Sequence, residues 1–181
     1  MSTNNKILTI DLDGVICGSP YPFKLGINKK ILNPKSAPPK AFVPPKILLK
    51  FTDKIRYSYR PILPNIKETL ITLQKHRKLI LLTGRRTSPI NWLEKNNIRK
   101  FFHEIIINQT SLASSHYKLY KIQDIKPEEH IDDDIQTIRL LNDITNCKLF
   151  LRVWNYNQKL SLPSDIQKIN DFKELTNFIT K

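Results

Sequence analysis

The sequence predicts a three-layer α/β fold, in which helices cover both faces of a parallel β-sheet. Short apolar runs with β-branched residues alternate with segments of helical periodicity, and this alternation is typical of successive β-α-β units. A packed core is expected because 40% of the residues are hydrophobic. At 181 residues, the chain suits one domain, or one domain with a modest insertion.

The core begins with a strand over residues 6–13, a short apolar run that continues into acidic residues. Residues 65–76 repeat apolar side chains in a helical period, and residues 78–84 form a second strand that ends at a glycine. The next helix is expected to start near Ser88, which is a suitable N-cap, with Pro89 at the first helical position.

The same alternation continues through the second half of the chain. We expect strands at residues 103–108, 128–134 and 147–154, and helices at residues 114–123, 135–144 and 171–179. Asn170 or Asp171 is expected to cap the last helix. Ligands of a parallel sheet bind beyond the carboxyl ends of its strands, so we expect the functional residues at that edge.

Residues 17–60 interrupt the pattern and are interpreted as an insertion. They hold ten Lys and Arg residues against one acidic residue, and seven of the twelve prolines, while the whole chain has a net charge of +14. Such an excess of positive charge points to anionic partners, which are nucleic acid, an anionic membrane surface or a phosphorylated substrate. No obligate protein partner is inferred.

Residues 46–59 of this insertion have the pattern of a basic amphipathic helix. Leu48, Phe51, Ile55 and Tyr59 fall on one helical stripe, and the four basic residues of the segment lie elsewhere on the helix. Such a helix can pack on the core, lie on an anionic membrane or contact a nucleic-acid backbone. Aromatic residues interleave with the basic ones across the insertion, which would also suit stacking on a nucleobase.

Composition excludes several classes of protein. The longest apolar runs are a few residues, whereas a membrane-spanning helix needs about 20. The N-terminus has no apolar signal core before its acidic residues. Cys17 and Cys147 are too few for a disulfide framework or a four-ligand zinc site. We therefore expect a cytoplasmic protein, either free or peripheral to a membrane through residues 17–60.

Polar side chains gather at the expected carboxyl ends of the strands. They are Asp11 and Asp13 after the first strand, Thr83 and Arg85 on either side of Gly84 after the second, Asp132–Asp134 after the fourth, and Lys118 and Lys121 on the helix before it. Clustered carboxylates repel one another unless a cation compensates, and Mg²⁺ prefers a few carboxylates together with water and phosphate. The sequence therefore predicts a Mg²⁺ site that takes a phosphorylated substrate.

The first two acids also suggest a reaction. Asp11 and Asp13 are two residues apart on a strand, so we expect their side chains to face the same way. One carboxylate can then act as a nucleophile toward phosphorus while the other handles protons. Thr83 and a lysine would hold the phosphoryl oxygens and stabilise the charge that develops on them.

In motif and order, these residues resemble the haloacid dehalogenase superfamily of phosphohydrolases, whose fold is Rossmann-like. DLDGV at residues 11–15 is similar to the first motif of that family, and LLTGR at residues 81–85 is similar to the second. A lysine on the helix before the fourth strand is similar to the third motif, and IDDD at residues 131–134 is similar to the fourth.

The resemblance implies a role for each acidic residue. Asp11 would be the nucleophile, and Asp13 would protonate the leaving group and then activate the hydrolytic water. Asp11, the backbone carbonyl of Asp13 and Asp133 would bind Mg²⁺, with Asp132 in support. The fourth motif often has a further acid four residues later, where this sequence has Thr137.

The resemblance also implies the phosphate contacts. Thr83, followed by Gly84, and Lys118 would bind the phosphoryl group, with Lys121 as the alternative lysine. Lys118 is preferred because a helix with Leu119 and Ile122 directed inward leaves it near the sheet edge. Arg85 and Lys121 are candidate substrate contacts.

Many relatives in this family carry a cap over the active site directly after the first motif. By this resemblance, the core comprises residues 1–16 and 61–181, and residues 17–60 form a small basic cap. The expected function is a Mg²⁺-dependent phosphatase that hydrolyses a phosphomonoester through an aspartyl-phosphate, with a nucleotide or a nucleic-acid 3′-phosphate as substrate. The alternatives are a membrane-surface phosphatase of a phospholipid-like substrate and a non-catalytic basic module that binds nucleic acid or lipid.

Overall fold

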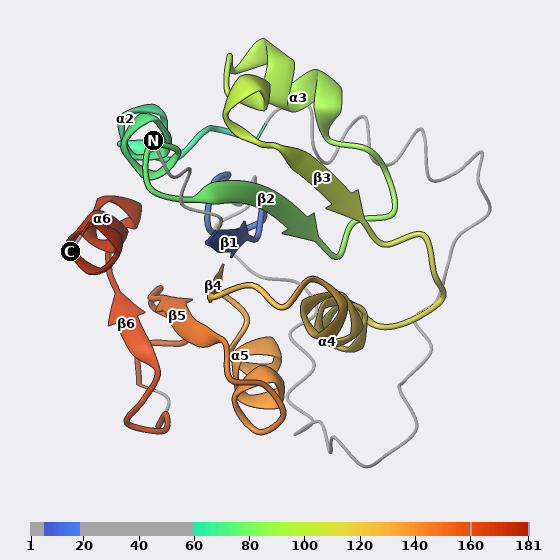
Figure 1. Ribbon diagram of the computed structural model, residues 1–181, viewed down its shortest axis with the longest axis vertical. Helices are drawn as coiled ribbons and strands as arrows, with labels where there is room; N and C mark the ends of the chain where they lie inside the picture. The colour runs from blue at the N-terminus through green and yellow to red at the C-terminus, as the bar shows by residue number, and fades with distance from the viewer. Residues whose placement is uncertain (1–5, 19–59, 160, 181) are drawn as a thin grey trace.

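The computed structural model describes residues 6–18, 60–159 and 161–180, and it contains a single parallel sheet within those residues (Figure 1). Six strands lie in the order β3-β2-β1-β4-β5-β6, and each neighbouring pair is parallel. The strands are β1 Ile7–Ile10, β2 Lys78–Thr83, β3 Glu104–Ile107, β4 Glu129–Asp132, β5 Lys148–Arg152 and β6 Gln167–Ile169. The predicted α/β fold with a parallel sheet is confirmed.

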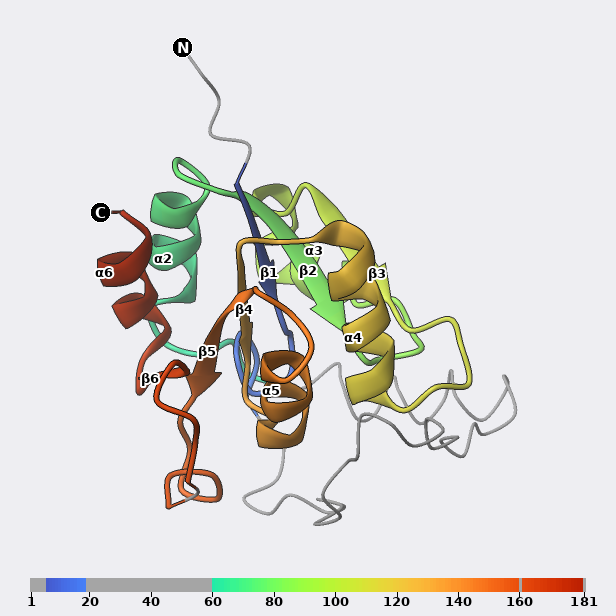
Figure 2. The ribbon, with the colours of Figure 1, turned by 60° about the horizontal axis from the view of Figure 1, so that its bottom comes forward.

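Helices cover both faces of this sheet, as Figures 1 and 2 show. The α-helices are α2 Ile66–Leu73, α3 Ile90–Lys95, α4 Ser114–Ile125, α5 Ile135–Asn142 and α6 Thr176–Ile179, and two short 3₁₀ helices are η1 Arg99–Phe101 and η2 Phe172–Leu175. Helices α2, α3 and α6 pack on one face and α4 and α5 on the other, which gives the three predicted layers.

Two apolar clusters fill the spaces between the layers, and the alternation of strand side chains assigns residues to them. Phe150 of β5 points into the cluster that α2, α3 and α6 cover. Its neighbours Leu149 and Leu151 point into the cluster beneath α4 and α5. All three side chains are buried, which explains why this strand is a continuous apolar run in the sequence.

Several element boundaries differ from the predictions. Strand β1 ends at Ile10, so Asp11 and Asp13 lie beyond it. Pro89 is the residue before α3 rather than its first residue, although Ser88 Oγ still accepts a hydrogen bond from Ile90 N at 3.4 Å. The last helix starts as the 3₁₀ turn η2, where Asp171 is the capping residue.

The two described ends of the region 17–60 lie side by side. Cys17 and Ile62 form an antiparallel bridge, and Gly18 N donates to Pro61 O at 2.9 Å. The chain therefore leaves and returns at one place, directly after the loop that follows β1. The amphipathic helix expected at residues 46–59 lies outside the described residues.

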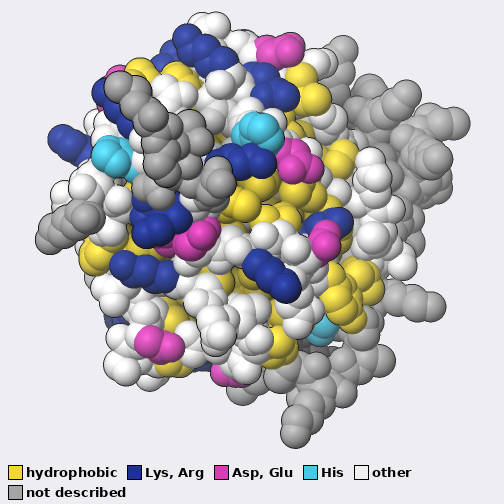
Figure 3. Space-filling model, viewed as in Figure 1, with side chains coloured by type: hydrophobic (Ala, Val, Ile, Leu, Met, Phe, Trp, Pro, Cys, Tyr) yellow, Lys and Arg dark blue, Asp and Glu magenta, His cyan; other side chains and the backbone are white. Residues whose placement is uncertain are grey.

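The surface of the described residues carries dispersed positive charge. In the view of Figure 3, Lys and Arg side chains lie at several separate places, with acidic and hydrophobic side chains between them. No helix among the described residues is long and apolar enough to cross a membrane.

Candidate active site

A pocket of about 270 Å³ opens at the carboxyl ends of β1, β2 and β4. Its walls come from Asp11 and Asp13 after β1, Thr83–Arg85 at the end of β2, Ser114 and Lys118 on α4, and Asp132–Asp134 at the end of β4. A parallel sheet brings the carboxyl ends of its strands to one edge, so segments distant in sequence meet in one cavity.

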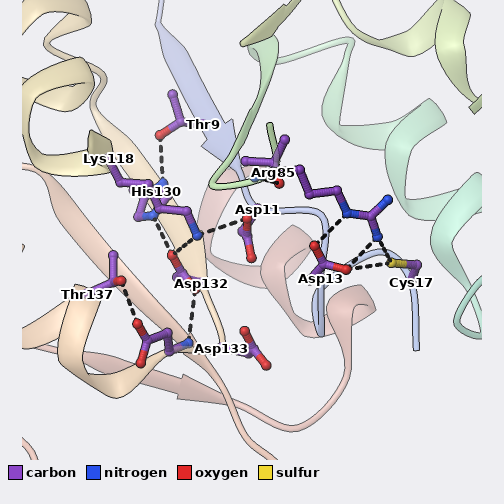
Figure 4. A network of polar contacts seen from close by, with 12 residues as sticks. Thr9, Asp11, Asp13, Cys17, Arg85, Lys118, His130, Asp132, Asp133 and Thr137 are labelled. Carbon is purple, nitrogen blue, oxygen red and sulfur yellow. Dashed lines mark hydrogen bonds and ion pairs between the residues drawn. The ribbon is translucent and has the colours of Figure 1, made fainter. Parts of the chain in front are cut away.

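Lys118 is the centre of the charge arrangement in this pocket (Figure 4). Its Nζ lies 2.9 Å from Asp11 Oδ1 and 2.6 Å from Asp132 Oδ2, and its side chain is only 3% exposed. Burial alone would lower the pKa of Lys118, but the carboxylates of Asp11 and Asp132 outweigh it and raise that pKa. The ammonium is therefore charged at neutral pH and joins two strand ends.

The two carboxylates that share this ammonium have pKa values shifted in opposite directions. Burial would raise the pKa of Asp132, but the Lys118 ammonium and a hydrogen bond from His130 hold it low. Burial raises the pKa of Asp11 well above its usual value, because Lys118 opposes this effect only in part and Asp132, Asp13 and Asp133 reinforce it. An additional positive charge beside Asp11 would favour its ionised form.

The acidic residues also fit the oxygen chemistry of Mg²⁺. Ligand atoms of Asp11, Asp132 and Asp133 all lie within 4.8 Å of one another. Asp11 Oδ1 is buried and, within the described parts of the chain, has no hydrogen-bond partner apart from the ion pair with Lys118. Several clustered carboxylates and an under-satisfied buried oxygen match the needs of a hard divalent cation. These three carboxylates could therefore hold Mg²⁺, together with the backbone carbonyl of Asp13 that the resemblance implies.

Asp13 lines the same pocket as Asp11, as expected, but its carboxylate has different partners. Arg85 donates to Asp13 from Nε at 2.7 Å and from Nη2 at 2.5 Å, and Arg60 Nη1 donates to the same carboxylate. Burial would raise the pKa of Asp13, but the two guanidinium groups lower it. Arg85, predicted as a substrate contact, is therefore buried beside Asp13. Arg60 was not singled out in the sequence.

Cys17 lies beside this cluster as a neutral thiol. Its Sγ is 3.5 Å from Asp13 Oδ1, and burial raises the pKa of Cys17 to about 12. The thiol therefore donates to the Asp13 carboxylate rather than acting as a nucleophile.

Thr83, Gly84 and Ser114 form the wall between β2 and α4. Thr83 Oγ1 accepts a hydrogen bond from Arg85 N at 3.3 Å. A Cβ added at Gly84 would lie 2.0 Å from Ser114 Oγ, so the glycine allows the first turn of α4 to approach β2. Ser114 begins the helix predicted for residues 114–123, but no motif had marked its side chain as part of the site.

The structure does not bring every candidate into the pocket. Lys121 pairs with Asp124 at 3.6 Å on the exposed side of α4, so it is neither the pocket lysine nor placed to contact substrate there. Asp134 caps α5 through Gln136 N at 3.1 Å, and its other oxygen accepts from Thr137 at 2.7 Å. Thr137, at the position of the further acid, thus supports a cap.

His130 contacts the site through Asp132, and the sequence had assigned this histidine no role. Its Nδ1 lies 2.9 Å from Thr9 Oγ1, and its Nε2 lies 3.4 Å from Asp132 Oδ2. The ring is fully buried, and that burial lowers the pKa of His130 despite the nearby Asp132 carboxylate. A neutral imidazole in this position orients Asp132 without competing with Lys118 for charge.

Comparison with known proteins identifies the fold rather than a near relative. No protein-family model matches the sequence, and no curated protein matches it. A subfamily IA hydrolase of the haloacid dehalogenase superfamily from Geobacter sulfurreducens is 13% identical with a TM-score of 0.61, over 98% of this chain and 98% of that chain.

Two other solved structures were determined with groups relevant to phosphate chemistry. CbbY from Rhodobacter sphaeroides, in complex with phosphate, is 10% identical with a TM-score of 0.58, over 94% of this chain and 96% of its own. YfnB from Bacillus subtilis, bound to magnesium, is 17% identical with a TM-score of 0.51, over 66% of this chain and 57% of its own. The chain has the fold of haloacid dehalogenase-like hydrolases, so the resemblance seen in the sequence is confirmed for the fold.

Proposed function

We propose that this protein is a Mg²⁺-dependent phosphatase of the haloacid dehalogenase type, which hydrolyses a phosphomonoester through an aspartyl-phosphate on Asp11. The observation that carries the proposal is the buried Lys118 ammonium, which joins Asp11 and Asp132 in the same pocket as Asp133. Burying an ammonium and two carboxylates carries a desolvation cost that hydrophobic packing would not, so their presence in one pocket favours a functional role. In this proposal, the Lys118 ammonium binds the phosphoryl group beside Asp11.

In the first step, a carboxylate oxygen of Asp11 forms a bond to phosphorus, and the bond from phosphorus to the leaving oxygen breaks. The leaving oxygen takes a proton from Asp13. In the second step, Asp13 removes a proton from water, whose oxygen attacks phosphorus and releases phosphate from Asp11. Each step transfers the phosphoryl group once, and Asp13 is again protonated at the end of the second step.

The charge around the phosphoryl group is balanced by several groups of the chain. Lys118 would contact phosphoryl oxygens, and the hydroxyl groups of Thr83 and Ser114 line the same pocket. Mg²⁺, when held by Asp11, Asp132 and Asp133, supplies positive charge to those oxygens and reduces repulsion between the substrate and Asp11.

The first step needs a protonated Asp13, and the contacts of this carboxylate affect its protonation. Arg85 and Arg60 favour the ionised carboxylate, which suits the later removal of a proton from water. The same contacts oppose the protonated form that must donate to the leaving oxygen. We infer that substrate binding weakens at least one of these guanidinium contacts.

Hydrolysis of a generic aryl phosphate tests the activity. The purified protein should release phosphate with Mg²⁺ and lose that activity with EDTA. Asp11→Asn should abolish turnover, and the matched control Asp143→Asn, an exposed position at the end of α5, should retain it. Full activity in Asp11→Asn would refute the mechanism.

The substrate proposal is a nucleotide or a nucleic-acid 3′-phosphate. Residues 17–60 support it, because they are rich in basic and aromatic side chains. This segment also leaves the core at Cys17, which pairs with Asp13. A panel of nucleotides, 3′-phosphorylated oligonucleotides and phosphorylated metabolites would rank kcat/KM. Activity confined to phospholipid-like esters, together with salt-sensitive binding to anionic vesicles, would favour the membrane-surface alternative instead.

A further inference from the structure

The turn formed by residues 154–157, which we call the WNYN turn, follows β5 at the same edge of the sheet as the pocket. None of its side chains lines the pocket. Three of them nevertheless make hydrogen bonds to the loops that carry the candidate metal ligands. These contacts have no part in the phosphoryl-transfer steps above, but they fix the positions of those loops.

Asn157 fixes the backbone of Asp133. Its side chain is fully buried, and its Nδ2 donates to Asp133 O at 3.0 Å and to Arg152 O at 2.9 Å. Its Oδ1 accepts from Trp154 N at 2.7 Å. Both functional atoms of the amide are therefore engaged, and the end of β5 is tied to the loop after β4.

Tyr156 fixes the carboxylate of the same residue. Its hydroxyl donates a hydrogen bond to Asp133 Oδ2, while its ring remains 38% exposed. A donor on one carboxylate oxygen restrains rotation of the group, and so limits the directions in which the other oxygen can point. Asp133 is thus held at both its backbone and its side chain by one short turn.

Trp154 extends the same support to the loop after β1. Its Nε1 donates to Gly14 O at 2.8 Å, and its ring is covered by the Arg152 guanidinium at 5.0 Å from the centroid. Gly14 has a φ of 78°, and a Cβ there would lie 2.0 Å from Asp133 Oδ2. The WNYN turn therefore holds the loop after β1, which contains Asp11 and Gly14, close to Asp133.

We propose that the WNYN turn positions Asp133 for divalent-cation binding, with Tyr156 as the positioning residue that orients its carboxylate. The inference deepens the proposed function, because the cation is the one that the phosphatase would use. Groups that orient metal ligands by hydrogen bonds typically contribute about 10- to 100-fold to metal affinity or activity. Removing the Tyr156 hydroxyl should therefore weaken cation binding about 10-fold.

Titration with Mn²⁺ provides a readout that does not depend on turnover. The electron paramagnetic resonance signal of free Mn²⁺ gives the dissociation constant for wild type, Tyr156→Phe and the matched control Tyr120→Phe. Tyr120 is 50% exposed on α4 and does not line the pocket, so its hydroxyl can be removed without touching the site. We expect about 10-fold weaker binding in Tyr156→Phe and wild-type binding in Tyr120→Phe.

A second measurement separates positioning from simple loss of folding. The half-saturating Mg²⁺ concentration for aryl phosphate hydrolysis should rise in Tyr156→Phe by the same factor as the Mn²⁺ dissociation constant. Thermal unfolding without metal should show that the variant is folded. Adding Mg²⁺ should then raise its melting temperature less than that of wild type.

The outcomes distinguish this inference from the proposed function. Unchanged or tighter Mn²⁺ binding in Tyr156→Phe, with Mg²⁺-dependent phosphatase activity intact in wild type, overturns the positioning role alone. Absence of Mn²⁺ binding in the wild-type protein overturns both. Equal weakening in Tyr156→Phe and Tyr120→Phe also overturns the inference, because the effect would not be specific to the hydroxyl on Asp133.

Discussion

Lys118 Nζ lies 2.9 Å from Asp11 Oδ1, so a helix in the second half of the chain delivers a buried ammonium to the loop after the first strand. Asp132 Oδ2, 2.6 Å from the same nitrogen, completes a bridge across the carboxyl ends of β1 and β4. This bridge joins two strand ends, and in the proposed mechanism the same side chain also binds the phosphoryl group.

Replacing Lys118 with methionine should therefore lower both stability and activity. The variant leaves two buried carboxylates without their ammonium, which typically costs about 3–5 kcal/mol. Turnover should fall at least about 100-fold because a group that stabilises the phosphoryl charge is lost. Urea denaturation and aryl phosphate hydrolysis measure the two effects. Lys121→Met is the matched control, and a similar loss in that surface variant would contradict the assignment.

Removing a buried ion pair at the end of the sheet away from the pocket should lower the stability of the fold without lowering activity. Arg77 donates to Glu129 from Nε and Nη2, both at 2.8 Å, and neither residue lines the pocket. Arg77→Met should cost about 3 kcal/mol in urea unfolding. Its kcat/KM under folding conditions should remain within about twofold of wild type. A large loss of kcat in the folded variant would show that the two ends of the sheet are coupled.

Gly84 tests how closely α4 must approach β2. Gly84→Ala places a methyl group against Ser114, and overpacking of this kind typically costs about 1–3 kcal/mol. The displaced α4 should also move Lys118 and lower kcat. The double variant Gly84→Ala/Ser114→Gly removes the obstructing side chain, so urea unfolding should show partial recovery of stability. A double variant no more stable than Gly84→Ala would contradict this explanation.

His116 should make the protein less stable in mild acid. Its ring is buried, neither ring nitrogen has a hydrogen-bond partner among the residues that the structure describes, and burial lowers its pKa from the ordinary value of 6.5. Below pH 6.5 the unfolded chain takes up a proton that the folded ring resists, so the free energy of unfolding decreases as pH falls toward the folded pKa.

Urea denaturation between pH 7.5 and about pH 5 measures this effect. His116→Leu should lose less stability than wild type over that range, whereas His103→Leu, at an exposed position, should follow the wild-type curve. Parallel curves for wild type and His116→Leu would show that this imidazole does not carry the effect.

Much of the fold was predictable because apolar runs and helical periods alternate so regularly. The meeting of Asp11, Thr83 and Asp133 follows from the same pattern, since a parallel sheet forces its carboxyl ends onto one edge. Strand β6 was not predicted, because its three residues include two polar side chains and take their strand geometry from pairing with β5.

The distinction between the two lysines depends on helical geometry. Lys118 lies four residues after Ser114 and shares its face of α4, so both reach the pocket. Lys121 is placed toward solvent near Asp124. Periodicity favoured Lys118, but only the three-dimensional structure shows its two carboxylate partners.

Arg60 and Tyr156 could not have been found by the same reasoning. Both lie in irregular segments, where no period assigns a side chain to a face. Arg60 reaches Asp13 because Cys17 pairs with Ile62, and Tyr156 reaches Asp133 because the WNYN turn folds back from β5. Such contacts depend on the path of a loop in space, which local sequence patterns do not specify.

Phosphorylation of Asp11 during turnover is tested most directly by trapping the phosphorylated protein. The protein would be mixed with an aryl phosphate and Mg²⁺, quenched, and reduced with borohydride, which converts an acyl phosphate to an alcohol. Peptide mass spectrometry should then show the corresponding mass change at Asp11 and at no other carboxylate. Turnover without modification at Asp11, or modification of a different residue, would contradict the account.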